Sequence, residues 1–456
     1  MKLYTTECLL STRDMTLELA CCRLLEHEAV ELASIPSNAE IYEALKSMKP
    51  YKAPGPDGLH AGFFQRHWNC VGDLVKDKVR NIFLSREMLA FLNQILIALI
   101  PKQKGPETIS HFRPISLCNT VYKLVTKILV QRLRPHMPNL ISPCQIAFVA
   151  GRRGSDNIII AQEIIYSLNK RKGKEGFMVV KTDLEKAYDR LEWCFIRKVL
   201  TCFGFPPNIT KLIMSCISSS STSLLFNREK LPPFTPSRGI RQGDPLSPFI
   251  FLLCMEYLNA QIEDLCDSKQ WIRVKASSGG PRFSHFFLFS FSFFFFFADN
   301  LLLFAKANTK NCKAITTTLG SFCDMAGQKV NKNKSKIFFS PNVTVQVKLD
   351  ICQQLGIKAN NNLGRYLGFP ILHKGRNGNA YNFVIGRVQD KLAGWKARIL
   401  SPARKRVLIN STSTPIVEYY MQCCVLLVKV CQVVDKLHRN FLWGSTEEKR
   451  KLHLVN

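Results

Sequence analysis

The sequence predicts an α+β fold, and three observations support that class. Apolar residues recur at helical spacing over 61–92, 120–136 and 380–440. Short apolar runs that are typical of buried strands stand apart from them, as at 94–100 and 177–181, and they are concentrated centrally. Hydrophobic residues make up 46% of the 456 residues, which is enough for an ordinary core. Helices and strands in separate stretches indicate α+β rather than a repeating βα unit.

The first 170 residues are predicted to be mostly helical. Residues 14–49 show helical spacing, and Lys52–His60 (KAPGPDGLH) holds two prolines and two glycines, which predict an ordered loop. The strand candidate Gln94–Ile100 ends at Pro101. The helix over 120–136 carries four Lys or Arg residues between its apolar ones, and 155–169 is a further helix candidate.

The centre of the chain holds most of the expected strands. Phe177–Lys181 (FMVVK) reads as a buried strand that ends in Thr182-Asp183, with a helix following to about residue 203. Short strands are expected at 223–226 and 234–240, around a turn. Residues 248–265 are apolar enough for a largely buried helix, and strand-like and then helical patterns follow Phe339.

The charge balance indicates a polyanionic partner. Lys plus Arg number 63 and Asp plus Glu number 34, a formal net charge of +29. Nucleic acid is the commonest large polyanion that such a protein meets, although a merely basic protein is the alternative. The N-terminus lacks the apolar run of a signal peptide, so secretion is not expected. Phe286–Phe304 is apolar but contains Asp299 and Asn300, so no membrane association is expected.

Two acidic residues follow apolar runs in a way that fits a metal site. Asp183 ends a strand in the run TDLEKAYD, and Asp299 lies in FADN, which we expect to form a tight turn between two strands. Acids at adjacent strand ends can hold two divalent cations, which activate the attacking and leaving oxygens of a phosphoryl displacement. Two unrelated surface acids are the alternative.

A glycine-containing basic turn, Arg241 to Leu246 (RQGDPL), precedes the apolar helix. The bare backbone at Gly243 allows close approach of a flat or charged ligand, and a helix N-terminus favours phosphate. Arg113 in FRPISL and Lys102 in IPK supply further cations, although each alone could be an ordinary solvated residue.

Together these segments resemble a known family. The ordered blocks are LIPK, FRPISL, QIAFVAGRRGSDNI, DLEKAYD, GIRQGDPLSP, FADN, KSKIFFS and YLGFP. This set is similar to the reverse transcriptase of plant LINE-type (non-LTR) retrotransposons, from about Lys52 to the C-terminus. The resemblance implies a right-hand polymerase fold. Residues 1–50 would be an N-terminal helical segment, 51–175 the fingers, 176–375 the palm and 376–456 a truncated helical thumb.

The resemblance also implies roles for individual residues. Asp183 and Asp299 match the two metal-binding aspartates, which would hold two Mg²⁺ (or Mn²⁺) ions, and Asn300 stands beside them in the catalytic turn. Tyr188 matches the steric gate that excludes a ribose 2′-OH. Nucleotide-binding residues would be Lys102, Arg113, Gln242 and Gly243, and the primer grip would be Tyr366, Leu367 and Gly368. Lys334 or Lys336 matches a lysine that protonates pyrophosphate; for Tyr366, simple core packing is the alternative.

The partners that the resemblance implies are an RNA template, a DNA primer and dNTPs. It also implies action in the nucleus, although no import cluster stands out. The sequence lacks the endonuclease that precedes this domain in full-length elements, so it looks like an internal fragment of a larger polyprotein.

Two departures from the family pattern predict weak or absent polymerase activity. Asn300 replaces the second aspartate of the turn, and twelve residues separate His285 from Ala298, where the family pattern has about three. The roughly nine extra residues fall in the strand that positions Asp299, and we expect them to form a bulge that is hard to place in a central strand. Of the residues Phe286–Phe297, nine are Phe and the rest are Leu or Ser. Codons for all three residue types can consist of pyrimidines alone, so we interpret this segment as a translated pyrimidine tract. The alternatives to a polymerase are a catalytically inactive remnant that binds RNA or an RNA–DNA hybrid, and a maturase-like RNA-binding factor.

Overall fold

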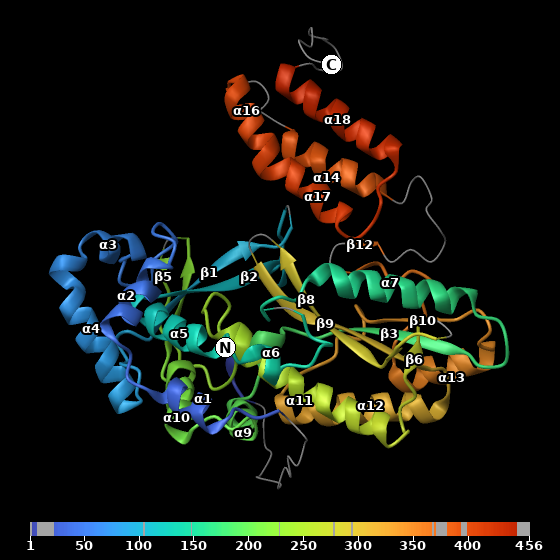
Figure 1. The fold of residues 1–456 in the computed structure, drawn as a ribbon, viewed down its shortest axis with the longest axis horizontal. Helices are drawn as coiled ribbons and strands as arrows, with labels where there is room; N and C mark the ends of the chain where they lie inside the picture. The colour runs from blue at the N-terminus through green and yellow to red at the C-terminus, as the bar shows by residue number, and fades with distance from the viewer. Residues whose placement is uncertain are drawn as a thin grey trace.

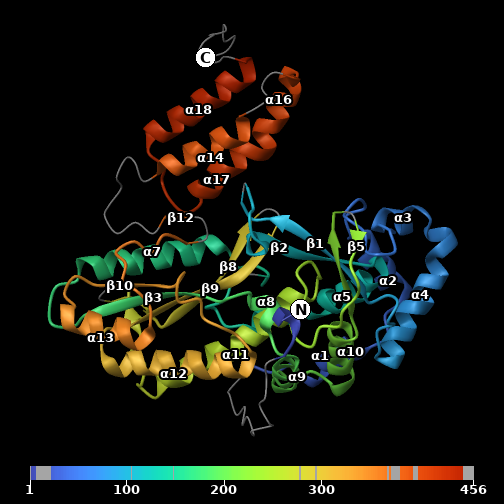
Figure 2. The same ribbon diagram turned by 180° about the vertical axis from the view of Figure 1, so that it is seen from behind.

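The computed structural model describes residues 2–6, 22–103, 105–146, 148–227, 229–276, 279–292, 295–366, 369–370, 381–393 and 399–444. Over this part of the chain it is a mixed α and β structure, which agrees with the α+β class (Figure 1). Two four-stranded sheets lie side by side, and a group of C-terminal helices stands above them. The view from behind shows the same arrangement (Figure 2).

The N-terminal elements surround the first sheet. They are η1 (Lys2–Tyr4), α1 (Glu26–Ala33), α2 (Asn38–Lys46), α3 (Ala61–Arg66), α4 (Trp68–Ser85), β1 (Gln94–Pro101), η2 (Ile109–His111), β2 (Phe112–Cys118), α5 (Thr120–Leu133), α6 (Met137–Leu140) and α7 (Gly154–Lys170). The expected strand at 94–100 is confirmed as β1. The helical stretch expected up to residue 49 is interrupted by Pro36. There the Ser37 side chain accepts a hydrogen bond from the Glu40 backbone N–H and starts α2.

The central elements build the second sheet and its covering helices. They are β3 (Phe177–Asp183), α8 (Ala187–Arg190), α9 (Trp193–Cys202), α10 (Pro207–Ser218), β4 (Ser221–Phe226), β5 (Glu229–Lys230), α11 (Ser247–Asp267), β6 (Val274–Lys275), β7 (Arg282–Phe283), β8 (His285–Ser292), β9 (Phe295–Lys306), α12 (Thr309–Ala326), β10 (Lys336–Phe339) and α13 (Val345–Leu355). The strands expected at 177–181 and 223–226 are present as β3 and β4. The buried helix expected at 248–265 is α11.

The first sheet has the order β2-β1-β4-β5, with β1 antiparallel to β2 and parallel to β4. The prediction of a strand at 234–240 is wrong. Only Phe234 forms an isolated bridge there, with Thr222. Gly239 has φ +93°, a left-handed conformation that breaks an extended strand. The next backbone N–H, that of Ile240, donates to the Tyr188 carbonyl and not to a neighbouring strand.

The second sheet has the order β10-β3-β9-β8 and is antiparallel throughout. Its central strand β3 is buried on both faces. Met178 and Val180 pack into the core that includes α11 and α12, whereas Phe177 and Val179 pack into the core that includes α7. Figures 1 and 2 show α7 over one face of this sheet and α11 and α12 over the other. This two-sided burial explains why the first four residues of FMVVK are all apolar.

The β8–β9 hairpin corrects two sequence expectations. Asp299 and Asn300 lie within strand β9, not in a tight turn. The added residues also make no nine-residue bulge in a central strand. β3 pairs with β9 only at 300–306, so the Phe-rich residues lengthen the hairpin beyond the end of β3. An antiparallel hairpin can absorb extra residues by adding pairs to its ladder, with one register irregularity between Leu288 and Ser290.

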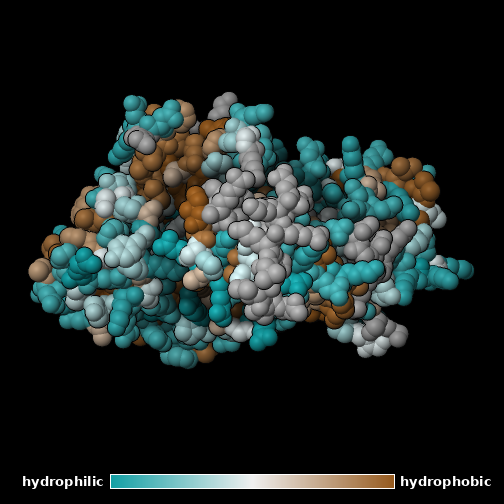
Figure 3. Space-filling model, turned by 90° about the horizontal axis from the view of Figure 1, so that it is seen from above, coloured by the Kyte–Doolittle hydropathy of each residue, from teal (hydrophilic) through white to brown (hydrophobic). Residues whose placement is uncertain are grey.

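The C-terminal part comprises β11 (Arg365–Tyr366), β12 (Phe369–Pro370), α14 (Asn382–Leu392), α16 (Pro402–Leu408), the π-helix η4 (Ile409–Ser413), α17 (Thr414–Met421) and α18 (Val428–Trp443). Its helices pack around Val384, Val388, Tyr420 and Val434. Figure 3, seen from above, shows a mostly hydrophilic face with hydrophobic patches. No helix among the described residues has the length and apolarity that crossing a membrane requires.

Candidate nucleotide and metal site

Asp183 ends β3 at a position that the backbone fixes from two directions. Its carbonyl accepts a hydrogen bond from the Asn331 N–H at 2.7 Å. Its own N–H donates to the Ser335 hydroxyl at 3.3 Å. The next residue, Leu184, forms an isolated antiparallel bridge with Val330. The segment 330–335, which precedes β10, therefore holds the end of β3 in place.

The strand register brings the second acidic segment to the same place. Asn300 of β9 is the Cα partner of Asp183, and Asp299 is the adjacent residue of β9 beyond that pair. The structure describes the backbone at 299 and 300. Two segments that are far apart in the sequence therefore meet at one end of the sheet.

The Asp183 carboxyl is partly buried and lies beside one lysine. Its side chain is 14% exposed, and Lys334 Nζ lies 3.7 Å from its Oδ2. Burial raises the pKa of Asp183, and the charges of Lys334 and Lys181 oppose that rise. Of the two lysines considered above, Lys334 is the one beside Asp183, whereas Lys336 Nζ donates to the Asn362 carbonyl. A partly desolvated carboxylate gains from a counter-charge, which Lys334 supplies here.

Four cations lie close enough to share one electrostatic field. Lys102 follows β1, and its ammonium donates to the Ser110 carbonyl at 2.9 Å. Burial lowers the pKa of Lys102, and the charges of Lys334, Arg113 and Lys186 lower it further. Such a group of cations is the arrangement that a polyphosphate neutralises. Both predicted cations, Lys102 and Arg113, thus belong to one group with Lys334.

The turn that contains Gln242 and Gly243 bridges two elements. The Gln242 carbonyl accepts from the Ser116 N–H of β2 at 2.8 Å. On its other side, the Gly239 N–H donates to the Leu191 carbonyl, and the Ile240 N–H donates to the Tyr188 carbonyl, both at 2.8 Å. We call residues 239–243 the bridging loop, because it ties the DLEKAYD segment to β2.

Glycine is required at position 243 for two reasons. Its φ is +117°, and a Cβ there would lie 2.9 Å from the Ser116 carbonyl oxygen. A side chain at this position would strain the backbone and push the loop away from β2.

Arg241, the first residue of the RQGDP turn, is not available to a ligand. That side chain is buried, its Nη2 donates to the Cys216 carbonyl at 2.7 Å, and its guanidinium stacks over the Tyr122 ring. Asp244 is also buried and accepts from the Tyr122 hydroxyl at 3.2 Å. A buried guanidinium needs such partners, so Arg241 serves the core.

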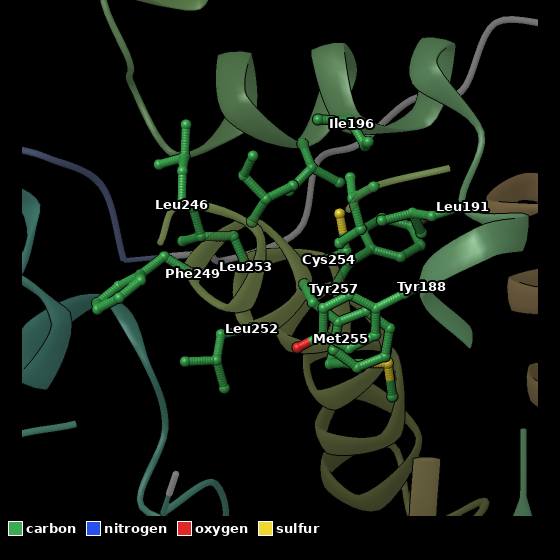
Figure 4. Close-up of a cluster of buried hydrophobic side chains, with 14 of the residues drawn as sticks. Tyr188, Leu191, Ile196, Leu246, Phe249, Leu252, Leu253, Cys254, Met255 and Tyr257 are labelled. Carbon is green, nitrogen blue, oxygen red and sulfur yellow. The ribbon is translucent and has the colours of Figure 1, made fainter. Parts of the chain in front are cut away.

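Tyr188 lies in the core beneath the bridging loop. Its ring stacks on Phe251 of α11, with ring centroids 5.0 Å apart, and it is 7% exposed. Figure 4 shows Tyr188 beside Met255 and Tyr257 in the same cluster. Its assignment as a steric gate stays a prediction.

The predicted primer grip is only partly described. Tyr366 belongs to β11 and is the register partner of Phe369 in β12. Leu367 and Gly368 lie outside the described residues.

Sequence reasoning did not single out two residues of this site, Lys186 and Asp189. Lys186 precedes α8 with φ +50°, and Asp189 is only 4% exposed. Both stand in the DLEKAYD run, so their positions just after a candidate metal ligand were the available signal.

The donor set at the end of β3 suits a hard divalent cation. Carboxylate and amide oxygens are the ligands that Mg²⁺ prefers, together with substrate phosphates. Among the residues whose side chains are described, no group of three or more His, Cys, Asp or Glu residues could hold a metal ion. Within those residues, Asp183 alone does not make a metal site.

Comparison with known proteins identifies the family of this chain. Residues 100–371 match the family model for "Reverse transcriptase (RNA-dependent DNA polymerase)". The match covers more than half of the chain, which therefore belongs to the reverse transcriptase family. More specifically, it is a reverse transcriptase domain of the LINE-type (non-LTR) retrotransposons.

Three relatives illustrate the relationship. The "Transposon TX1 uncharacterized 149 kDa protein" of Xenopus laevis is 24% identical over 89% of this chain and 30% of its own length. A Pol polyprotein of the retrotransposable element R2 from Popillia japonica is 26% identical over 91% of this chain and 54% of its own. That of element R2DM from Drosophila melanogaster is 27% identical over 62% and 24%. The chain thus spans about half or less of these relatives.

Proposed function

We propose that this chain is an RNA-directed DNA polymerase domain that extends a DNA primer on an RNA template by two-metal nucleotidyl transfer. The observation that carries the proposal is the register of β3 and β9, which pairs Asp183 with Asn300 and puts Asp299 next to that pair. Asp183 and Asp299 would hold two Mg²⁺ or Mn²⁺ ions. When bound, the ions lower the pKa of the attacking 3′-hydroxyl and stabilise the leaving pyrophosphate.

The nucleotide would lie among the cations. Lys102, Arg113 and Lys334 supply positive charge for its triphosphate, and the bridging loop would lie beside its base and sugar. Tyr188 would then limit the space under the ribose. Lys334 is also the better placed of the two lysines to give a proton to pyrophosphate, because it lies beside Asp183.

The three parts of a right-hand polymerase fit the observed layers. The first sheet with α1–α5 would form the fingers, the second sheet with α7, α11 and α12 the palm, and α14, α16, α17 and α18 the thumb. The parts interleave along the sequence. β4 and β5 come from the 176–375 span but lie in the first sheet, and α7 comes from the 51–175 span but covers the second.

A second candidate function, binding of an RNA–DNA hybrid without catalysis, is favoured by Asn300. The side-chain amide keeps an oxygen donor but brings no negative charge. A unit-charge contact near 4 Å is worth about 4 kcal/mol at an effective dielectric of about 20. Loss of that energy in the transition state would slow the reaction about a thousandfold. The lengthened β8–β9 hairpin, which puts Asp299 inside a strand, acts in the same direction.

Primer extension on an RNA template distinguishes the two functions. The assay compares the unaltered chain with Asp183→Asn, with Asn300→Asp, and with Asn300→Asp that also lacks residues 287–295, each with Mg²⁺ and with Mn²⁺. Extension by the unaltered chain that Asp183→Asn abolishes supports the polymerase. Extension by the shortened Asn300→Asp variant alone identifies a polymerase scaffold that has lost catalysis, and supports the binding function.

A further inference from the structure

The N-terminal residues 3–6 are bonded to the segment that leads into the bridging loop. The Leu3 carbonyl accepts from Arg238 Nε at 2.9 Å, and the Tyr4 carbonyl accepts from the Ser237 N–H at 2.8 Å. The Thr6 N–H donates to the Ser237 hydroxyl at 2.7 Å. We call residues 2–6 the N-terminal strap. It lies along 237–238, immediately before the loop begins at Gly239.

The strap meets the loop at one buried carboxyl group. The Tyr4 hydroxyl donates to Asp189 Oδ1 at 3.4 Å, and Gln242 Nε2 donates to Asp189 Oδ2 at 3.5 Å. Both donor–acceptor distances are longer than those of an ordinary hydrogen bond, so these contacts orient the groups more than they stabilise them. Burial raises the pKa of Asp189 to about 7, and Lys186 opposes that rise.

The backbone of Asp189 also limits the loop. A Cβ at position 239 would lie 2.7 Å from the Asp189 carbonyl oxygen, so only glycine fits against it. The cavity between Tyr4, Asp189 and Gln242 has a volume of about 30 Å³, which is room for one water molecule. Asp189 therefore contacts both the strap and the loop.

We propose that Asp189, held by the Tyr4 hydroxyl, is a positioning residue that orients the Gln242 side chain and so sets the bridging loop for the incoming nucleotide. Gln242 connects two parts of the site: its side chain reaches Asp189, and its carbonyl accepts from the Ser116 N–H of β2, the strand that contains Arg113. The nucleotide part of this inference rests on the proposed function.

The chemistry of the two donors predicts what substitutions do. Asp189 faces a hydroxyl and an amide, and each donates a hydrogen to it. Asparagine offers one acceptor oxygen and one N–H₂ group, so Asp189→Asn sets one donor against another and loses one contact. Tyr4→Phe removes only the hydroxyl that donates to Asp189. The Asp189–Gln242 contact remains, but the Asp189 carboxyl is held less firmly.

The test uses the full chain and two measurements. Hydrogen exchange of the backbone amides at 239–247 reports the loop without any ligand. Affinity for a dNTP is measured in Ca²⁺ on an RNA template whose DNA primer ends in a dideoxynucleotide, and affinity for the primer–template itself is measured separately. Tyr257→Phe is the matched control, because it removes a similarly buried hydroxyl on α11 that contacts Met325 and Gln261 instead.

We expect Asp189→Asn and Tyr4→Phe to exchange about three- to tenfold faster at 239–247 and to bind dNTP weaker by a similar factor, with primer–template affinity unchanged. Tyr257→Phe should match the unaltered chain at these amides. Unchanged exchange in both variants overturns the positioning role, and faster exchange with unchanged dNTP affinity overturns its link to the nucleotide. If the unaltered chain binds no dNTP at all, the proposed function itself is overturned. The exchange data still report on the Asp189 contact, so the two failures can be distinguished.

Discussion

Substitution of two glycines by alanine should have opposite effects, because their surroundings differ. At Gly243, φ is +117° and the new Cβ would lie 2.9 Å from the Ser116 carbonyl oxygen. A non-glycine residue in such a conformation costs about 1–3 kcal/mol, and losing the bond from the Ser116 N–H to the Gln242 carbonyl costs about 1 kcal/mol more. We therefore expect Gly243→Ala to weaken closure of the bridging loop by about 2–4 kcal/mol.

Gly320 is the matched control. It lies inside α12, and no heavy atom stands within 4 Å of the Cβ that an alanine would add. Removing a helical glycine reduces the backbone entropy lost on folding, so Gly320→Ala should stabilise the protein by about 0.5–1 kcal/mol.

Native-state hydrogen exchange measures both effects, with the Ser116 amide as the direct probe of the loop. In Gly243→Ala, the opening free energy that exchange of this amide reports should fall by about 2–4 kcal/mol, whereas exchange of the α12 amides should not change. In Gly320→Ala, protection of α12 should rise and Ser116 should not change. Equal protection of Ser116 in Gly243→Ala and the unaltered chain would refute the argument from φ and close approach.

Three further predictions concern charge. Burial raises the pKa of Glu256 to about 7, so the folded state binds a proton more tightly than the unfolded state, and stability falls as pH rises from about 4.5 to 7. Glu256→Gln should therefore raise the unfolding free energy by about 2 kcal/mol at pH 8.5 and change it little at pH 4. Equal changes in unfolding free energy at both pH values would contradict this. Arg132 is almost fully buried and pairs with Glu40 through both Nε and Nη2, so Arg132→Met should lower stability by about 3 kcal/mol in thermal unfolding, whereas Lys127→Met on the same helix should not. Binding of an RNA–DNA hybrid, followed by fluorescence anisotropy, should weaken steeply between about 50 and 200 mM salt because phosphate contacts release counterions, and nearly constant affinity would exclude a cationic binding surface.

Local sequence patterns predicted the sheet that carries Asp183 well. FMVVK is apolar at every position but the last because β3 is buried on both faces, and Asp183 lies at the end of the strand, in its last pair with β9. The family resemblance then placed Lys102 and Arg113 near it, which no pattern of spacing could do. Their grouping depends on the pairing of β1 with β2 and on the approach of the segment before β10, both long-range contacts.

The failures have physical causes that one sequence does not reveal. The Arg241–Leu246 segment was described as a basic turn, but the Arg241 side chain is buried, and its partners, the Cys216 carbonyl and the Tyr122 ring, come from segments that are distant in the sequence. FADN was expected in a turn because a polar pair interrupts apolar residues, but the preceding phenylalanines extend the ladder past it. The Asp189 carboxyl was missed because its partner Tyr4 is 185 residues away in the sequence.

The lengthened hairpin has a consequence for the purified protein. β8 is an outer strand of its sheet, and on its open side the described residues provide one isolated bridge, from Gln145 to Phe287. Between Phe286 and Phe297 the sequence has no charge and no proline, the features by which natural edge strands resist pairing with another molecule. This strand can therefore template β-addition between molecules, and shortening it should delay precipitation as well as change catalysis.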